Sequence, residues 1–255
     1  GNTGAPASLG ALTIDSTAPA TPAAPDLIAS SDTGTSDTDN LTGDNTPTFT
    51  GSGGTAGDTA TLYIDGVAAG TATIDAEGNW SITTGERADG TYDVTVSFTD
   101  TAGNESAQST ALEVTIDTTA PATPAAPDLI ASSDTGTSDT DNLTGDNTPT
   151  FTGSGGTAGD TATLYIDGVA AGTATVDAGG NWSITTAERA DGTYDVTVSF
   201  TDTAGNESAQ STALEVTIDT TAPAALTASL NTDTGSAGDD SVTNNGLIDV
   251  GNIET

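Results

Sequence analysis

The residues best suited to chemistry are carboxylates, which crowd into the stretch SSDTGTSDTDNLTGDNTPTF at 30–49. Asp32, Asp37, Asp39 and Asp44 lie within thirteen residues there, with no basic residue nearby. Carboxylates this close in sequence repel one another unless they are solvated or share a cation. The stretch is therefore either a solvated acidic loop shaped by Asx turns or part of a cation site.

The composition limits which cation could bind. The 255 residues include 37 Asp and Glu against 2 basic residues, which gives a formal charge of −35, and the chain has no Cys and no His. The usual zinc and iron ligands are therefore missing, and the oxygen donors that remain suit Ca²⁺, which accepts 6 to 8 oxygens. A polyanionic chain is also a poor partner for nucleic acid or an anionic membrane surface.

Neither local calcium motif is complete. The segment DTDNLTG from Asp37 places Leu41 where an EF-hand loop needs its third oxygen ligand, and GGTAGD at 53–58 has Ala56 in place of the glycine of the nonapeptide calcium repeat. Any calcium ligands must therefore come together through the fold.

The chain is organised as a repeat of 102 residues, because Pro19, Pro121 and Pro223 are evenly spaced. The acidic stretch recurs unchanged at 132–151. We predict two complete units at 16–117 and 118–219, which differ at four positions only. We interpret residues 1–15 as the tail of a preceding repeat and residues 220–255 as the truncated start of a third, divergent repeat.

Within each unit the apolar residues alternate with polar ones, as in β-strands, and no helical period appears. In GTYDVTVSFTD, Tyr92, Val94, Val96 and Phe98 share one face, and Asp93, Thr95 and Ser97 are expected on the other. Asp-Gly pairs mark turns between such segments. About seven short strands per unit predict an all-β fold of tandem immunoglobulin-like β-sandwiches in an extended string, with Tyr92 in the position of a tyrosine corner.

This topology predicts which carboxylates meet. The first loop and the exit of the last strand lie at one pole of such a sandwich, and the penultimate loop lies at the other. At the junction of the two units, the acidic stretch and Asp117 of the first unit should therefore face the DTAGN segment of the second. We expect Ca²⁺ there, with Asp117, Asp202 and Asp32 as the strongest candidates, followed by Asp39, Asp44 and Asn206. The equivalents one period away are Asp15, Asp100, Asn104, Asp134, Asp141, Asp146 and Asp219.

Other functions find less support in the residues. Without His, Cys or Lys, catalysis would depend on paired carboxylates, and units with so few aromatic residues are not expected to form a large pocket, so we predict no enzyme. A carbohydrate-binding or cell-surface interaction module is the alternative, with Tyr63 as its main aromatic candidate because Trp80 and Tyr92 are needed in the core.

The linked elements DTTAPATPAAP, GDNTPTFTG, GNW, DGTY and DTAGNES together resemble the bacterial immunoglobulin-like repeats of large, type I secreted, biofilm-associated and RTX-type surface adhesins. The resemblance covers both complete units and both flanking segments. It implies β-sandwich extenders with Ca²⁺ in and between them. The Ca²⁺ ligands that it implies most securely are the carboxylates of Asp117, Asp202, Asp134 and Asp146 and the amide of Asn206. Their counterparts in the neighbouring repeats are Asp15, Asp219, Asp100, Asp32, Asp44 and Asn104.

The resemblance implies an extracellular stalk on the bacterial cell surface that projects a distal adhesion module for cell adhesion and biofilm formation. Its expected partners are calcium ions and the neighbouring repeats of the same chain, which would form a monomeric string without membrane insertion.

Overall fold

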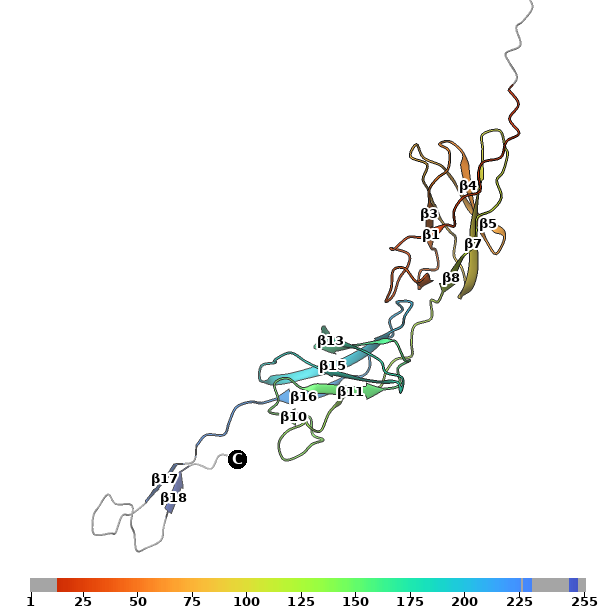
Figure 1. Cartoon of the computed structure of the whole chain (residues 1–255). Coiled ribbons are helices and arrows are strands. Elements are labelled where there is room, and N and C mark those ends of the chain that lie inside the picture. Colours follow the sequence, from red (N-terminus) through yellow and green to blue (C-terminus); the bar gives the residue numbers. More distant parts are fainter. Residues whose placement is uncertain (1–12, 226, 231–247, 252–255) are drawn as a thin grey trace, which may run out of the picture.

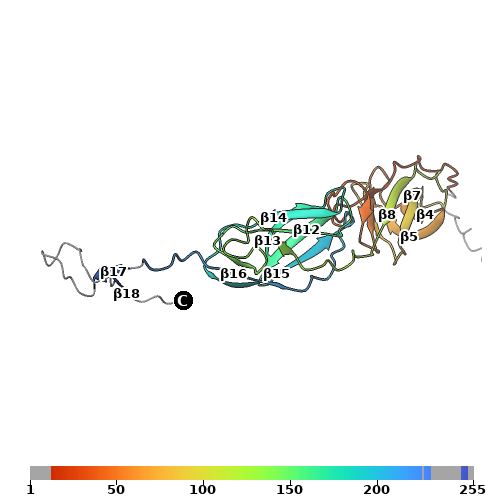
Figure 2. The ribbon, with the colours of Figure 1, turned by 90° about the horizontal axis from the view of Figure 1, so that it is seen from below.

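Two β-sandwiches lie end to end along the chain, and a two-stranded sheet follows them (Figure 1, Figure 2). The computed structural model describes residues 13–225, 227–230 and 248–251. The predicted tail of a preceding repeat and the predicted third unit therefore fall largely outside the described residues, apart from β17 (Thr227–Leu230) and β18 (Ile248–Gly251), which pair with each other. Within the described ranges there is no helix that could span a membrane.

The first domain packs a three-stranded sheet, in the order β1-β3-β6, against a five-stranded sheet, in the order β2-β8-β7-β4-β5. Its strands are β1 (Asp26–Leu27), β2 (Leu41–Thr42), β3 (Thr48–Gly51), β4 (Thr59–Ile64), β5 (Val67–Thr73), β6 (Trp80–Thr83), β7 (Gly90–Thr99) and β8 (Leu112–Ile116). The expected number was about seven. The domain has eight strands because the acidic stretch separates two short segments that join different sheets: β1 pairs with β3, and β2 runs parallel to β8.

The second domain repeats this arrangement, with sheets in the orders β14-β11-β9 and β10-β16-β15-β12-β13. Its strands are β9 (Asp128–Leu129), β10 (Leu143–Thr144), β11 (Thr150–Ser154), β12 (Thr161–Ile166), β13 (Val169–Thr175), β14 (Asn181–Thr185), β15 (Gly192–Thr201) and β16 (Leu214–Ile218). The two domains therefore form a tandem pair of all-β sandwiches, as the alternating pattern predicted.

Each domain has its own hydrophobic core, built from the inward face of the alternating strands. In the first domain, buried apolar side chains from both sheets include Phe49, Leu62, Trp80, Val96 and Phe98, all at most 4% exposed. Burial of this apolar surface is the main stabilising contribution to each sandwich. Because the two cores are separate, each domain can be stable without the other.

The predicted turns and the tyrosine corner are present. Asp65 and Gly66 join β4 to β5 with φ values of 50° and 75°, the left-handed conformation that a tight two-residue hairpin requires. The hydroxyl of Tyr92 donates a 2.8 Å hydrogen bond to the backbone carbonyl of Ala88, which ties the start of β7 to the preceding loop.

One residue of β7 departs from the expected pattern. Ser97 was expected on the solvent face, but it is fully buried. Its hydroxyl donates a 2.7 Å hydrogen bond to Glu105, whose carboxylate also accepts a 2.7 Å hydrogen bond from the hydroxyl of Tyr63. The segment after β7 therefore folds back over the outer face of its own sheet, which strand periodicity alone does not reveal.

Candidate functional site

The acidic stretch forms the long loop between β1 and β3, and β2 interrupts it. Asp44 shapes the end of this loop: its Oδ1 accepts hydrogen bonds from the N–H and the hydroxyl of Thr46, and its Oδ2 accepts one of 2.8 Å from the hydroxyl of Ser31. Asp39 lies exposed on the loop, where it accepts a 3.1 Å hydrogen bond from the N–H of Leu41. Both carboxylates thus hold Asx turns in their own loop.

Asp146 occupies the same place as Asp44 in the second domain. Burial opposes ionisation of this carboxyl, but hydrogen bonds from the N–H of Thr148 and the hydroxyl of Ser133 outweigh it and hold the pKa of Asp146 below its ordinary value. The carboxyl is therefore kept as an anion by its own loop.

Asp32 differs from these residues because it is buried, with only 4% of its surface exposed. Its Oδ2 accepts a 3.2 Å hydrogen bond from the N–H of Asn40, whereas its Oδ1 is buried and has no hydrogen-bond partner. Burial raises the pKa of Asp32, and the nearby charges of Asp39, Asp37 and Asp26 raise it further. A buried carboxylate oxygen with no partner is costly and calls for a cation or a proton.

The surroundings of Asp32 form a small hollow of about 290 Å³ at the side of the loop. Asp26 from β1, together with Asp37 and Asn40 from the acidic stretch, lines this hollow with Asp32. Leu27, Ala29, Thr38 and Leu112 complete the lining. No basic side chain lines this hollow, so the charge there is negative.

The second domain repeats the arrangement. Asp134 is 3% exposed, its Oδ2 accepts a 3.1 Å hydrogen bond from the N–H of Asn142, and its Oδ1 is buried without a partner. Asp128 and Asp139 line the equivalent hollow of about 300 Å³. The orphaned oxygen is thus a regular feature of both domains.

The segment DTAGN after β7 and after β15 forms a tight turn that its own aspartate closes. In the second domain the N–H of Asn206 donates a 2.8 Å hydrogen bond to Oδ1 of Asp202, and its Nδ2 donates one of 3.0 Å to Oδ2. In the first domain, equivalent hydrogen bonds from Asn104 lower the pKa of Asp100. Asp100 and Asp202 therefore act as turn anchors.

The turn of the second domain contacts the acidic stretch of the first domain, as the topology predicted (Figure 1). The backbone carbonyl of Ala204 accepts hydrogen bonds from the hydroxyl of Thr33, at 2.7 Å, and from the N–H of Gly43, at 2.9 Å. The N–H of Thr35 donates a 3.4 Å hydrogen bond to the carbonyl of Thr203. All three are made by backbone groups and a neutral hydroxyl, not by carboxylates.

The aspartates that end each last strand also act through their backbones. The carbonyl of Asp117 accepts a 2.7 Å hydrogen bond from Nδ2 of Asn206, and the carbonyl of Asp15 accepts one of 3.2 Å from Nδ2 of Asn104. The carboxylates of Asp15, Asp117 and Asp219 each accept a hydrogen bond from the N–H two residues later. Among residues 13–225, no group of three carboxylates stands ready to hold a metal ion, so the ligand assignments stay predictions.

Two roles were missed by reasoning from the sequence. Asp26 and Asp37 line the hollow with Asp32, although Asp26 lies in β1, outside the acidic stretch. Asp89 precedes Gly90 in one of the Asp-Gly pairs that mark turns, and its carboxylate also accepts hydrogen bonds from the hydroxyl groups of Thr118 and Thr119, at 2.7 and 2.8 Å. Asp89 thus clamps the start of the interdomain linker, and Asp191 does the same for Thr220 and Thr221.

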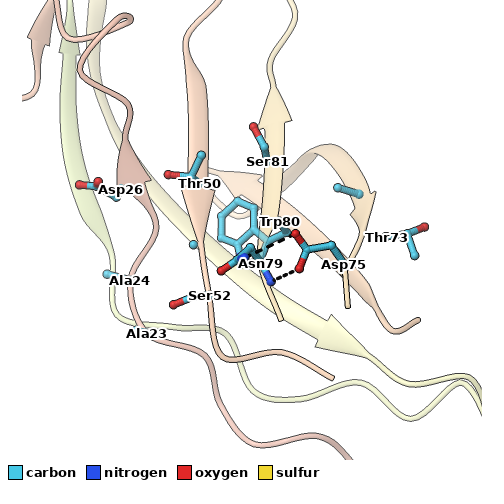
Figure 3. Close-up of a pocket in the computed structure, with 12 residues that line it drawn as sticks. Ala23, Ala24, Asp26, Thr50, Ser52, Thr73, Asp75, Asn79, Trp80 and Ser81 are labelled. Carbon is cyan, nitrogen blue, oxygen red and sulfur yellow. Dashed lines mark hydrogen bonds between the residues drawn. The ribbon is translucent and has the colours of Figure 1, made fainter. Parts of the chain in front are cut away.

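A groove of about 740 Å³ lies elsewhere, beside β1, β3 and β6 (Figure 3). Asp75 and Asn79 at its rim are hydrogen-bonded to each other, and Trp80 below them is only 4% exposed. Tyr63, the aromatic candidate for sugar binding, is half-buried and its hydroxyl is held by Glu105. The indole of Trp80 is therefore part of the core and is not presented to a sugar ring.

Solved structures similar to the chain include several bacterial surface proteins. A Ca²⁺-stabilised adhesin with which an Antarctic bacterium binds ice is 32% identical, covers 86% of this chain and 54% of that one, and has a TM-score of 0.41. A structure from a 1.5-MDa bacterial ice-binding adhesin is 29% identical over 80% of this chain and 66% of that one, with a TM-score of 0.36. The BSP domain of a biofilm-associated protein is 22% identical over 71% and 29% of the two chains, with a TM-score of 0.27.

This chain therefore spans about half of the first of these structures and two thirds of the second. No curated protein sequence matches it. The family model for the bacterial Ig-like domain matches twice, at residues 17–118 and 120–220, and so covers both sandwiches. The chain belongs to the bacterial Ig-like domain family.

Proposed function

We propose that the chain is an extender segment of a bacterial surface adhesin, in which Ca²⁺ bound near each interdomain junction stiffens the string of domains. The observation that carries this proposal is the buried Oδ1 of Asp32, which has no hydrogen-bond partner, together with the identical state of Asp134. A carboxylate buried beside other carboxylates destabilises the domain unless a cation compensates its charge.

The residues around Asp32 fit Ca²⁺. Asp26, Asp32 and Asp37 line one hollow and would supply carboxylate oxygens once a cation draws them together, and the side-chain amide of Asn40 would supply a further oxygen. Hard oxygen donors in an irregular arrangement are what Ca²⁺ accepts, and water completes its shell where the protein does not. In the second domain the matching set is Asp128, Asp134, Asp139 and Asn142.

A cation in this hollow would act on the junction through the loop. Thr33, which follows Asp32 directly, donates its hydroxyl to Ala204 of the next domain. An ion held by Asp32 would therefore order the same loop that contacts the neighbouring domain, while the Asp89 clamp holds the start of the linker. Prolines at 121, 124 and 127 stiffen the rest of the linker.

The role that follows is mechanical rather than catalytic. A stiff string of sandwiches at the bacterial cell surface projects a distal adhesion module away from the cell, and its partners are calcium ions and neighbouring repeats. The surplus of acidic residues fits this setting, because Ca²⁺ at each junction offsets the mutual repulsion of the carboxylates.

Small-angle X-ray scattering of the full chain tests the proposal, with calcium or chelator at equal ionic strength. We expect a narrow distribution of interdomain angles with calcium and a broader one with chelator. The double variant Asp32→Asn/Asp134→Asn should give the broad distribution in both buffers. The exposed strand pair Glu113→Gln/Glu215→Gln, which lies outside the candidate ligands, should respond as the unmodified chain does. Identical scattering of the unmodified chain in both buffers would contradict the proposal.

A further inference from the structure

The two domains carry the same contact surfaces, but among the described residues only the turn of the second domain and the socket of the first contact another sandwich. The turn at 202–206 of the second domain lies in a socket of the first domain, formed by residues 33–35 and 41–43. The second domain has an equivalent socket at 135–137 and 143–145, with the same sequence as the socket of the first domain. The first domain has an equivalent turn at 100–104, with the same sequence as the turn of the second domain. The chain thus provides its own comparison between an occupied and an open joint.

Side chains at the occupied joint are more buried than the same side chains in the other copy of the repeat. Ala204 at the tip of the occupied turn is 1% exposed, whereas Ala102 at the tip of the other turn is exposed. Leu41 beside the occupied socket is half-buried, whereas Leu143 beside the open socket is 49% exposed. Because the sequences are the same, the neighbouring domain causes these differences.

The occupied socket accepts the turn only because three glycines let the backbones approach. A Cβ added to Gly34 would collide with the carbonyl oxygen of Thr203, and one added to Gly43 would lie 2.8 Å from Oδ1 of Asn206. A Cβ added to Gly205 in the turn would lie 2.8 Å from the backbone nitrogen of Gly34. The joint therefore depends on backbone shape and on the smallest side chain at each position.

The unoccupied copies have room at the same positions. A Cβ on Gly136 or on Gly103 would meet nothing within 4 Å, and one on Gly145 would make only 3.5 Å contacts with the carbonyl oxygen of Asp219 and the hydroxyl of Thr135. A hollow of about 300 Å³ lies there, lined by Thr135, Gly136, Leu143, Gly145 and Asp219 among others. The carbonyl of Asp219 corresponds to that of Asp117, which accepts the side-chain amide of Asn206 in the occupied joint.

We propose that this hollow of the second domain is a binding site for the D-T-A-G-N turn of another Ig-like repeat, and that the joint closes without metal. The hydrogen bonds across the occupied joint come from a threonine hydroxyl, two backbone amides and an asparagine amide, with backbone carbonyls as acceptors. None of these groups is charged, so these hydrogen bonds form without a cation as a ligand. The inference rests on the proposed stalk arrangement but is independent of calcium.

The proposal that the open socket binds a turn is tested by adding a third sandwich that carries the same turn. Residues 118–219 are inserted once more after Asp219 in the full chain, so that a third sandwich with an identical turn follows the second. Amide hydrogen exchange of Thr137 and Gly145, followed by NMR in chelator, should slow roughly tenfold and approach the rates of Thr35 and Gly43. Unchanged rates in a chain with three folded domains would overturn the proposal.

The occupied joint is tested with matched substitutions in the full chain, also in chelator. The distribution of distances between spin labels on the two domains is measured for Ala204→Glu and for Ala102→Glu. We expect a broader distribution for Ala204→Glu only, because Ala204 is buried against the neighbouring sandwich whereas Ala102 is exposed. Equal distributions for the two variants would show that the turn does not hold the joint.

A second pair of matched substitutions separates loss of the joint from backbone strain within one domain. Gly34 and Gly136 both have left-handed φ values, 103° and 114°, so substitution by Ala strains both backbones alike. Gly34→Ala should broaden the interdomain distance distribution, and Gly136→Ala should leave it unchanged. In the chain with the inserted third sandwich, Gly136→Ala should become disruptive at the new joint. These measurements contain no calcium, so their failure and the failure of the calcium proposal are distinguishable.

Discussion

The side-chain amide of Asn206 donates a 2.7 Å hydrogen bond to the backbone carbonyl of Asp117, 89 residues earlier in the chain. The same asparagine also closes its own turn through Asp202. One residue thus links the shape of the turn in the second domain to the end of the last strand in the first. Interdomain orientation is therefore built into the turn itself.

Asn206→Ala should loosen the junction. The substitution removes a neutral hydrogen bond, which typically contributes about 1 kcal/mol, and faster amide exchange in the linker should report the loss. Asn104→Ala is the matched control because it removes the same bonds within a turn, while its bond to Asp15 is longer, at 3.2 Å, and exposed. A linker that exchanges equally in both variants would contradict this role of Asn206.

Calcium should raise the melting temperature of the full chain more than NaCl of equal ionic strength does. A ligand that binds only the folded state stabilises it by mass action, whereas NaCl only screens the surface charges. In scanning calorimetry, Asp32→Asn/Asp134→Asn should lose the calcium-dependent part of the increase, and the exposed control pair Glu113→Gln/Glu215→Gln should keep it. Equal shifts with the two salts would point to general charge screening.

The calcium effect should also depend on pH. Burial and neighbouring carboxylates raise the pKa of Asp32 in the folded state above its unfolded value. Without metal, ionisation of Asp32 therefore costs stability as the pH rises through the folded pKa. With calcium, stabilisation needs the ionised carboxylate and should be lost in acid, at a pH below the metal-free pKa because the bound cation favours the ionised form. Calorimetry across a pH series with and without calcium measures both trends, and a calcium effect that persists fully in acid would exclude Asp32 as a ligand.

The Asp89 clamp should open in acid. Hydrogen bonds from the hydroxyl groups of Thr118 and Thr119 and from the N–H of Thr118 hold the pKa of Asp89 below its ordinary value in the folded state. The clamp therefore stabilises the linker above the unfolded pKa, and this contribution is lost as the pH falls through the lower folded pKa. NMR titration of the Thr118 amide should follow this change, and Asp89→Asn should remove the titration.

The tyrosine corner should contribute measurably to each domain. Tyr92→Phe removes the 2.8 Å hydrogen bond to Ala88 and should lower the free energy of unfolding of the first domain by roughly 0.5 to 1.5 kcal/mol. Tyr194→Phe should act equally on the second domain, where the bond to Ala190 is 2.9 Å. Because the two sites lie in separate cores, the double variant should show additive losses in urea unfolding.

Gly51 should be intolerant of a side chain. A Cβ there would lie 2.6 Å from the indole ring of Trp80, so Gly51→Ala should destabilise the first domain by about 1 to 3 kcal/mol through overpacking. Gly85→Ala is the control, because a Cβ there meets nothing within 4 Å and the second domain has Ala187 at the same position. Equal stability of the two variants would mean that Trp80 can move aside.

The repeat, the strands and most of the core can be predicted from residue patterns, because side chains alternate between the two faces of a strand. Phe49, Val96 and Phe98 follow from that alternation. The Asp65-Gly66 hairpin and the tyrosine corner follow equally from local chemistry, since the turn needs left-handed residues and the corner needs a tyrosine at the start of a strand. Such features depend on neighbours close in sequence.

Which acidic residues lie together depends on contacts between segments that are distant in sequence. Asp26 approaches Asp32 and Asp37 because β1 and the acidic stretch fold around one hollow, and no sequence spacing encodes that approach. Ser97 is buried because a later segment folds over its strand, and Ala204 is buried whereas Ala102 is exposed, although both lie in the same five-residue sequence. Burial and unpaired oxygens arise from contacts between distant parts of the chain, and those contacts exist only once the domains have formed and docked.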